Sequence, residues 1–174
     1  MDLSSSWAYL RGVAAERLSH NKTSRHIDRY GEEIELLGAA GELAARRFLK
    51  LPTSLHRVFD GGADFIWKGW RVDVKATRLT PRLEFRYLQW PETKPIRADL
   101  VLLTAVNVAT QAAVVVGWAT ADQVAAAPVN PERDYPCHEI PVPSLRPPSE
   151  LLTIEPKEAH VGQEAQVDRA QAAA

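Results

Sequence analysis

A stretch near the middle of the chain constrains the fold most, because it holds two strand-like segments around a tight turn. In residues 70–77 apolar and polar side chains alternate, the period-2 pattern of a strand with one apolar face. Residues 65–67 form a second short apolar run. Residues 68–69, a lysine and a glycine, suit a two-residue turn in which a residue tolerates positive φ. We therefore expect an antiparallel hairpin that pairs Trp67 with Trp70.

The expected register brings two carboxylates together. It places Asp64 directly opposite Asp73, and the alternation puts Lys75 on the same face as Asp73. Opposed side chains in an antiparallel pair have Cβ atoms about 5 Å apart, where like charges destabilise the sheet. Mg²⁺ binds through one or two carboxylates with water and phosphate oxygens, so it would relieve this repulsion. The hairpin thus suggests metal-assisted phosphodiester chemistry, while an ordinary exposed strand face remains the alternative.

A helix with a small-residue face is expected upstream, over residues 32–50, with Pro52 ending it. Gly38 and Gly41 each weaken an isolated helix by ~1 kcal/mol relative to alanine, so they predict close packing against another element. Glu42 lies on this face and is a third candidate acid. An exposed helix charge is its simpler interpretation.

Further elements are expected on both sides of this region. Helices are predicted over residues 5–20 and from the capping box at Thr120 to about 127, and strands over 56–59, 83–88, 99–107 and 111–118. Eight of the twelve prolines lie between Pro128 and Pro156, which predicts an extended wrap with residues 138–142 as a short edge strand. The Trp90-Pro91 pair is expected to break the strand that precedes it. The loop over residues 21–33 is predicted to be surface.

The expected fold class is α/β, a mixed sheet flanked by helices. Residues 1–156 would form one domain and residues 157–174 a flexible tail. The four tryptophans at 67, 70, 90 and 118 are expected in the core or in strand pairs.

Charge is distributed unevenly along a nearly neutral chain. The formal net charge is −1, but residues 68–97 hold eight basic side chains against three acidic ones. This local surplus surrounds the hairpin. The single cysteine, Cys137, fits a reducing compartment, and no signal peptide or membrane span is recognisable, so a cytoplasmic protein is expected.

In these features the chain resembles the PD-(D/E)XK nuclease superfamily over about residues 32–127. The similarity rests on Glu42 in Gly-Glu-Leu-Ala, on Asp64 in the first hairpin strand, and on the Asp-Val-Lys triplet 73–75 in the second, in that order. Where the family most often has proline before its first aspartate, this chain has Ala63. The resemblance implies a restriction-endonuclease-like core with an N-terminal helix and a proline-rich C-terminal extension.

The resemblance also implies a Mg²⁺-dependent nuclease, with Mn²⁺ as a substitute ion. The implied catalytic residues are Glu42, Asp64, Asp73 and Lys75. The implied metal ligands are Asp64, Asp73 and the Val74 carbonyl, with Glu42 completing the shell or binding a second ion. Asp60 is a rival to Asp64 as the first ligand.

The implied partner is nucleic acid, with DNA preferred and RNA left open, and Arg78, Arg82 and Arg86 would bind its phosphates. No membrane partner is expected, and a homodimer is left open. The competing hypothesis is a nuclease-fold module that binds nucleic acid or a protein without turnover.

Overall fold

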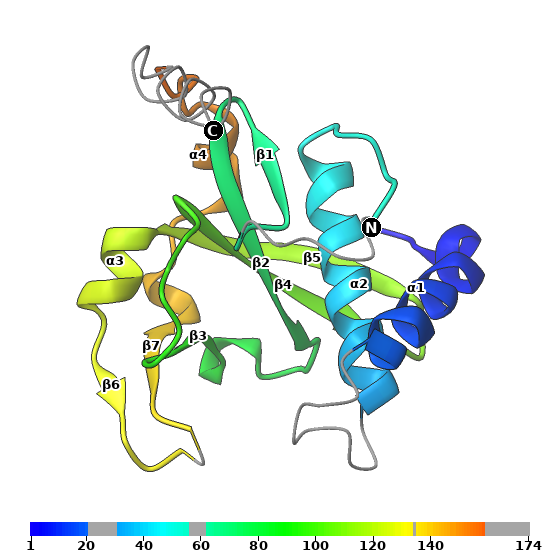
Figure 1. Cartoon of the computed structure of the whole chain (residues 1–174), viewed down its shortest axis with the longest axis horizontal. Helices are drawn as coiled ribbons and strands as arrows, with labels where there is room; N and C mark the ends of the chain where they lie inside the picture. The colour runs from blue at the N-terminus through cyan, green and yellow to red at the C-terminus, as the bar shows by residue number, and fades with distance from the viewer. Residues whose placement is uncertain (21–30, 56–61, 134, 159–174) are drawn as a thin grey trace, which may run out of the picture.

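The protein, represented by a computed structural model, is described over residues 1–20, 31–55, 62–133 and 135–158. Its chain is drawn in Figure 1. The helices are α1 (Trp7–His20), α2 (Gly31–Phe48), α3 (Ala121–Ala126) and α4 (Pro148–Leu152), with 3-10 turns at Ser4–Ser6, Leu83–Phe85 and Val142–Ser144. The strands are β1 (Phe65–Trp67), β2 (Trp70–Arg78), β3 (Tyr87–Pro91), β4 (Leu100–Asn107), β5 (Ala112–Thr120), β6 (Val129–Asn130) and β7 (Cys137–Pro141).

The main sheet is mixed, as expected. Among the described residues its strand order is β1-β2-β4-β5. The β1–β2 and β4–β5 pairs are antiparallel, whereas β2 and β4 run parallel. A parallel pair needs a long crossover, and here the connection over residues 79–99 carries β3. The expectation of a mixed α/β fold is thereby confirmed.

Strand β4 lies at the centre of the molecule and is buried on both faces. Leu100 and Leu102 point into the core cluster shared with β1, β2 and α4. Val101 and Leu103 point the opposite way, into a cluster with β3, β7 and α3. Because successive side chains of a strand alternate, a near-continuous apolar run is the composition that such a position requires.

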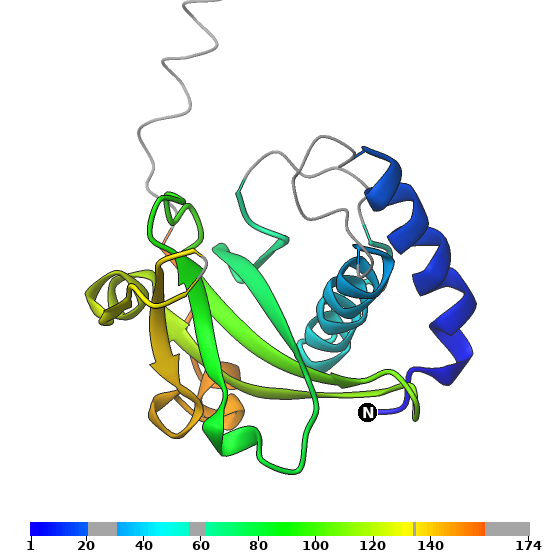
Figure 2. The same cartoon turned by 90° about the horizontal axis from the view of Figure 1, so that it is seen from below.

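The two faces of the main sheet are covered differently. Figure 2 shows α2, with α1 outside it, on one side, and α3 with β7 on the other. Gly41 makes the α2 contact a close one, because a Cβ placed there would lie 2.8 Å from the Ala76 Cβ on β2. The prediction of tight helix packing is confirmed at Gly41, whereas a Cβ at Gly38 would meet nothing within 4 Å.

The hairpin and the α3 cap agree with the sequence prediction. Trp67 pairs with Trp70, and the turn residues Lys68 and Gly69 both have positive φ, at 49° and 81°. Both hydrogen bonds of the Thr120 capping box are formed at the start of α3.

The expectation for residues 83–88 was wrong. They form a 3-10 turn at Leu83–Phe85 followed by the first residues of β3. Trp90 and Pro91 belong to that strand rather than breaking it. The Trp90 ring is buried and its indole N–H donates to the Lys94 carbonyl at 2.8 Å, while Pro91 occupies the last paired position, where a missing N–H costs least.

The proline-rich part does more than wrap the core. In the described chain it supplies β6, β7 and α4, and β7 lies between β3 and β6 in a second sheet. The strand predicted at residues 138–142 is present as β7, but it is the central strand of this sheet rather than an edge strand. Its pairing partners come from segments far apart in sequence, so local composition does not identify them.

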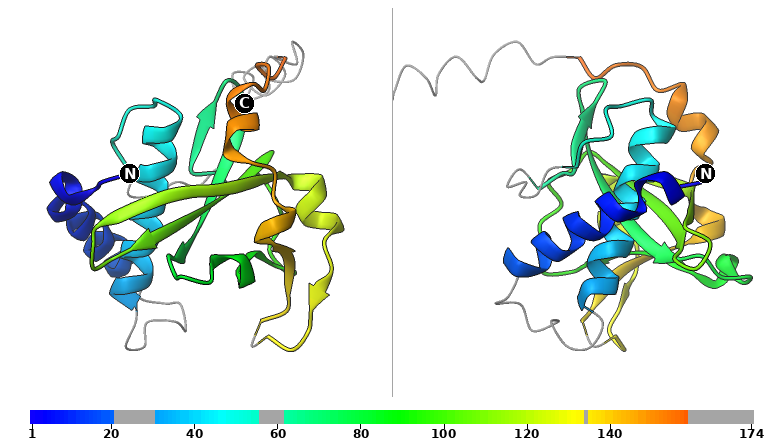
Figure 3. Two further views of the ribbon diagram at one scale, coloured as in Figure 1. Left: turned by 180° about the vertical axis from the view of Figure 1, so that it is seen from behind. Right: turned by 90° about the vertical axis from the view of Figure 1, so that its right-hand side faces the viewer.

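Residues 155–157, close to the end of the described chain, bind the turn end of the β1–β2 hairpin. Figure 3 shows α4 beside this hairpin. The Lys157 N–H donates to the Lys68 carbonyl at 2.9 Å, and the Trp70 indole N–H donates to the Glu155 carbonyl at 3.0 Å. Lys157 also pairs with Asp99 at 2.9 Å. The start of the predicted tail is thus held against the domain.

Several expectations lie outside the described residues. They are the strand at 56–59, the loop residues 21–30 and the tail from 159 onward. Within the described ranges, no helix has the length and apolar character that crossing a membrane requires.

We predict opposite effects for alanine at the two glycines of α2. Gly41→Ala should lower the free energy of unfolding by about 1–3 kcal/mol, because its Cβ overlaps the sheet. Gly38→Ala should raise it by up to about 1 kcal/mol, because helix propensity improves without a clash. Urea denaturation followed by circular dichroism measures both, and equal effects would contradict the close contact at Gly41.

Candidate active site

The hairpin places Asp64 at an open edge of β2. Pairing ends at Phe65 and Val72, so Asp64 is not directly opposite Asp73 as the extended register predicted. Instead, the Asp64 main-chain N–H donates to the Val72 carbonyl at 2.7 Å, and its carboxylate accepts the Val74 N–H at 2.6 Å. The side chain thus takes the place that a further strand residue would occupy.

Asp73 and Lys75 share one face of β2, as the alternation predicts. Asp73 is buried, 6% exposed, and the Lys75 ammonium bonds to its carboxylate. The Lys75 Nζ also lies 4.3 Å from the ring centroid of Trp90, a cation–π contact. Burial and this pairing exclude the alternative of an ordinary exposed strand face.

Trp90 is a contact residue that the sequence did not identify. The prediction of a core tryptophan is correct, since Trp90 is 1% exposed. Its contact with Lys75 joins the second sheet to the candidate site. No spacing or motif relates the two residues, because the contact depends on how the sheets pack.

Glu42 is buried rather than being an exposed helix charge, since only 3% of the residue is accessible. Its Oε2 accepts a hydrogen bond from Arg17 of α1 at 2.6 Å, and its Oε1 lies 3.8 Å from the Arg46 Nε. A buried carboxylate needs such partners to remain charged. Arg46, at i+4 on the same helix, was detectable from spacing, whereas Arg17 was not.

Asp64 is close enough to the other two acids for their charges to act on it. Burial above all, and then the negative charges of Asp73 and Glu42, raise the pKa of Asp64 from 3.8 to about 7. The Val74 N–H and the Lys75 ammonium oppose this shift without cancelling it. Near neutral pH, Asp64 therefore lacks full compensation for its charge.

The donor set fits Mg²⁺ better than a metal that needs a protein cage. Across the described residues, no three acidic, histidine or cysteine side chains are arranged to hold a metal ion. Glu42 is engaged by two arginines and Asp73 by Lys75. Mg²⁺ requires only one or two carboxylates, with water and phosphate completing its shell, so Asp64 and Asp73 satisfy its minimum. The negative charges of Asp73 and Glu42 near Asp64 would make a cation there electrostatically favourable.

The backbone of Val74 supports the same conclusion. Its N–H points to the open edge of β2, where the Asp64 carboxylate accepts it. In a strand, the N–H and C=O of one residue point toward the same neighbour, so the Val74 carbonyl also faces this edge. The rival ligand Asp60 lies outside the described residues.

The basic residues after the hairpin separate into two groups. Arg78 pairs with Glu33 of α2 at 2.7 Å. Arg82 and Arg86 instead line a surface hollow of about 580 Å³, together with Thr80 and Pro81. This hollow is formed by the segment that directly follows β2.

Comparison with protein-family models, with curated proteins and with solved structures found no match. The resemblance drawn from the residues alone therefore stays a prediction. The class that fold and site define is a mixed α/β protein in which a buried Asp–Lys pair on one strand lies beside an acid at that strand's open edge.

We predict that Asp64→Asn stabilises the metal-free protein at high pH. The folded state binds a proton that the unfolded state releases between pH 3.8 and about 7, so wild-type stability falls as the pH rises through this window. One pKa unit is about 1.4 kcal/mol, so the variant should gain at most about 4 kcal/mol above pH 7 and nothing below pH 4. Thermal unfolding in EDTA across this range measures the difference.

Asp99→Asn is the matched control. Although burial acts to raise it, hydrogen bonds from Arg71 and Lys157 hold the pKa of Asp99 below its usual value. The ionised carboxylate therefore stabilises the fold above its unfolded pKa, and this variant should lose stability at pH 8. If both variants shift in the same direction, the assignment of Asp64 as a strained acid is wrong.

Proposed function

We propose that this chain is a metal-dependent nuclease of the PD-(D/E)XK type that hydrolyses phosphodiester bonds in nucleic acid, with DNA as the first substrate to test. The observation that carries the proposal is Asp64 at the open edge of β2, where it binds the Val74 N–H beside the Asp73–Lys75 pair and within the influence of the Glu42 charge. Three acids held near one another and largely out of water destabilise a fold, which is expected where a site requires them.

The residues would divide the work as follows. Asp64, Asp73 and the Val74 carbonyl would hold Mg²⁺ or Mn²⁺, with Glu42 as a further ligand. When bound, the ion polarises a phosphate and acidifies a coordinated water. Lys75 would leave Asp73 and turn its ammonium toward the phosphate or the attacking water, where charge develops.

Trp90 suits this change of partner for Lys75. Its ring face attracts the ammonium without a directional hydrogen bond, so Lys75 can exchange Asp73 for a phosphate oxygen while staying over the ring. The Lys75 ammonium would therefore stay near the site whether it binds Asp73 or a phosphate oxygen.

The fold is compatible with a restriction-endonuclease-like core. A helix carrying the acid Glu42 precedes a hairpin that carries Asp64 and the Asp-Val-Lys triplet, and the hairpin's second strand joins a mixed sheet. This order of elements is the one that the resemblance implies.

A binding module without turnover is the second candidate. The observation that favours it is the existing charge pairing: Glu42 is held by Arg17, and Asp73 by Lys75. Because these ion pairs already neutralise Glu42 and Asp73, the site is stable without a metal. Turnover requires that the metal ion compete with the Lys75 ammonium for Asp73.

Cleavage assays with two site variants distinguish these functions. Purified protein is incubated with linear, plasmid and single-stranded DNA and with RNA, in Mg²⁺ or Mn²⁺. Asp73→Asn and Lys75→Met should each lower the cleavage rate by about 10²–10³-fold, because each removes charge stabilisation from the reacting phosphate. Asp122→Asn, which changes an exposed acid on α3, should leave the rate unchanged. Metal-dependent cleavage that survives both site variants would refute the proposed mechanism, and binding without any cleavage would support the module.

A second prediction concerns the arginine hollow. Replacing both Arg82 and Arg86 by glutamine should reduce the slope of log Kd against log salt by about 2, because each phosphate that the protein neutralises adds roughly 0.9 to that slope. Arg78→Gln should change it less, because Glu33 already neutralises part of that charge. Fluorescence anisotropy with labelled duplex DNA over a salt series measures the slopes. An unchanged slope in the double variant would mean that other residues bind the phosphates.

A further inference from the structure

Arg46 is a buried arginine that contacts two separate segments outside its own helix. It lies in the last turn of α2 with 6% of its surface exposed. One guanidinium nitrogen donates to the Asp64 carbonyl at 3.1 Å, and the other donates to the Pro52 carbonyl at 3.3 Å. The guanidinium carbon lies 4.9 Å from the ring centroid of Phe65, the first residue of β1. These contacts hold the buried Arg46 side chain in one place between α2, the Pro52 segment and the start of β1.

These contacts connect two of the candidate acids. Arg46 holds the main chain of Asp64, whose carboxylate in turn accepts the Val74 N–H. The Nε of the same side chain lies 3.8 Å from the Oε1 of Glu42. One guanidinium therefore lies between the acid on the helix and the acid on the hairpin.

The Nε atom adds independent support. It is buried, and no acceptor in the described part of the chain lies within hydrogen-bond distance of it. An unpaired buried N–H is unfavourable, and Glu42 Oε1, at 3.8 Å, is a short movement away. Arg17 binds the other oxygen of Glu42. The Arg46 Nε–H is thus free to donate a hydrogen bond to Glu42 if the Glu42 carboxylate moves closer.

We propose that Arg46 is a positioning residue for the metal site: it fixes Asp64 relative to Glu42, so that the carboxylate set binds a divalent cation more tightly when Arg46 is in place. This inference rests on the proposed function. It extends that function by naming a residue that touches neither metal nor substrate.

The geometry requires arginine rather than lysine. A planar guanidinium donates to two carbonyls from different segments while its face covers an aromatic ring. A lysine ammonium at this position keeps the positive charge beside Glu42 but is a single point, so it does not bridge Pro52 and Asp64 in the same way. Charge and positioning are therefore separable by substitution.

Mn²⁺ titration by isothermal calorimetry tests the inference on the full chain. Arg46→Met should weaken Mn²⁺ binding by about 10–100-fold, the usual effect of removing a residue that orients metal ligands. Arg46→Lys should also weaken it, because charge alone does not restore the bridge.

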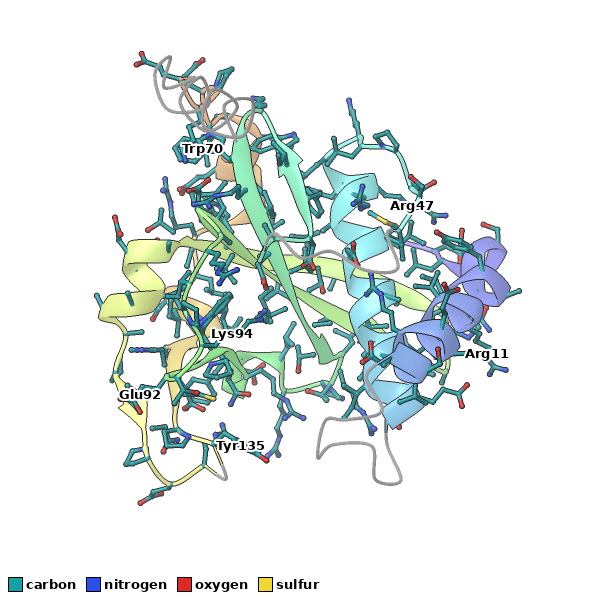
Figure 4. All side chains as sticks on the ribbon, in the orientation of Figure 1. Arg11, Arg47, Trp70, Glu92, Lys94 and Tyr135 are labelled. Atoms are coloured by element: carbon teal, nitrogen blue, oxygen red, sulfur yellow. The ribbon has the colours of Figure 1, made fainter. Side chains whose placement is uncertain are left out.

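Arg47→Met is the matched control. Arg47 is the next residue of α2 and also donates two hydrogen bonds, to the Asp2 carbonyl at 2.8 Å and to the Ser6 hydroxyl at 2.6 Å. Figure 4 shows its side chain directed toward the N-terminal segment. Arg47→Met therefore removes a comparable arginine without touching the acids, and its Mn²⁺ affinity should match that of the wild type.

Cleavage kinetics provide a second measurement, at a temperature where circular dichroism shows every variant folded. For Arg46→Met, the Mg²⁺ concentration giving half-maximal rate should rise by about 10-fold or more while the KM for DNA stays within about twofold. A residue with a merely structural role would lower the rate without shifting the Mg²⁺ dependence.

The outcomes separate the inference from the function on which it rests. If the wild type binds Mn²⁺ and cleaves DNA, and Arg46→Met behaves as Arg47→Met does, the positioning role is wrong and the nuclease proposal stands. If Arg46→Lys binds Mn²⁺ as the wild type does, charge rather than bridging is responsible, and the inference is overturned. A wild type that neither binds Mn²⁺ nor cleaves overturns both.

Discussion

The close approach of α2 to the main sheet at Gly41 is the constraint on which the candidate site depends. Without a Cβ, this residue lets the helix lie against Ala76 of β2 and Thr104 of β4. Glu42 follows directly and is also buried. A buried carboxylate needs cationic partners, and Arg17 supplies one from α1, which packs outside α2. The tight helix–sheet contact at Gly41 and the Arg17–Glu42 pair therefore lie on neighbouring residues of α2.

The edge of β2 is the second determining feature. Because the ladder with β1 ends at Phe65, the Val74 N–H and carbonyl are released from strand pairing on that side, and the Asp64 carboxylate binds the N–H. At this edge, peptide groups free of strand pairing lie beside an acid whose pKa is raised by burial and by neighbouring negative charge. The opposite side of β2 is paired along its length with β4, which keeps this edge rigid. Rigid support is what a metal or phosphate site requires.

The sequence predicted those elements that depend only on residues close together in the chain. The hairpin turn, the helix over residues 32–50 and the Thr120 cap follow from side-chain periodicity, from residues that tolerate positive φ and from capping hydrogen bonds within a few residues. The prediction of a strand at 83–88 was wrong. The strand lies at Tyr87–Pro91 instead, because the burial of Trp90 and pairing with residues 137–141 outweighed the local preference for a break at Pro91. Pairing between distant segments leaves no signal in either segment alone.

The sequence by itself determined the hairpin pairs between the turn and Phe65–Val72, and that Asp73 and Lys75 share a face, because both follow from the period of a strand. Only the tertiary structure decided that Glu42 is buried, that Trp90 lies over Lys75 and that Arg46 connects Asp64 with α2. Those facts depend on the packing of elements that are distant in sequence. Burial and neighbouring charge, not residue identity, raise the pKa of Asp64 and distinguish this edge from an ordinary strand.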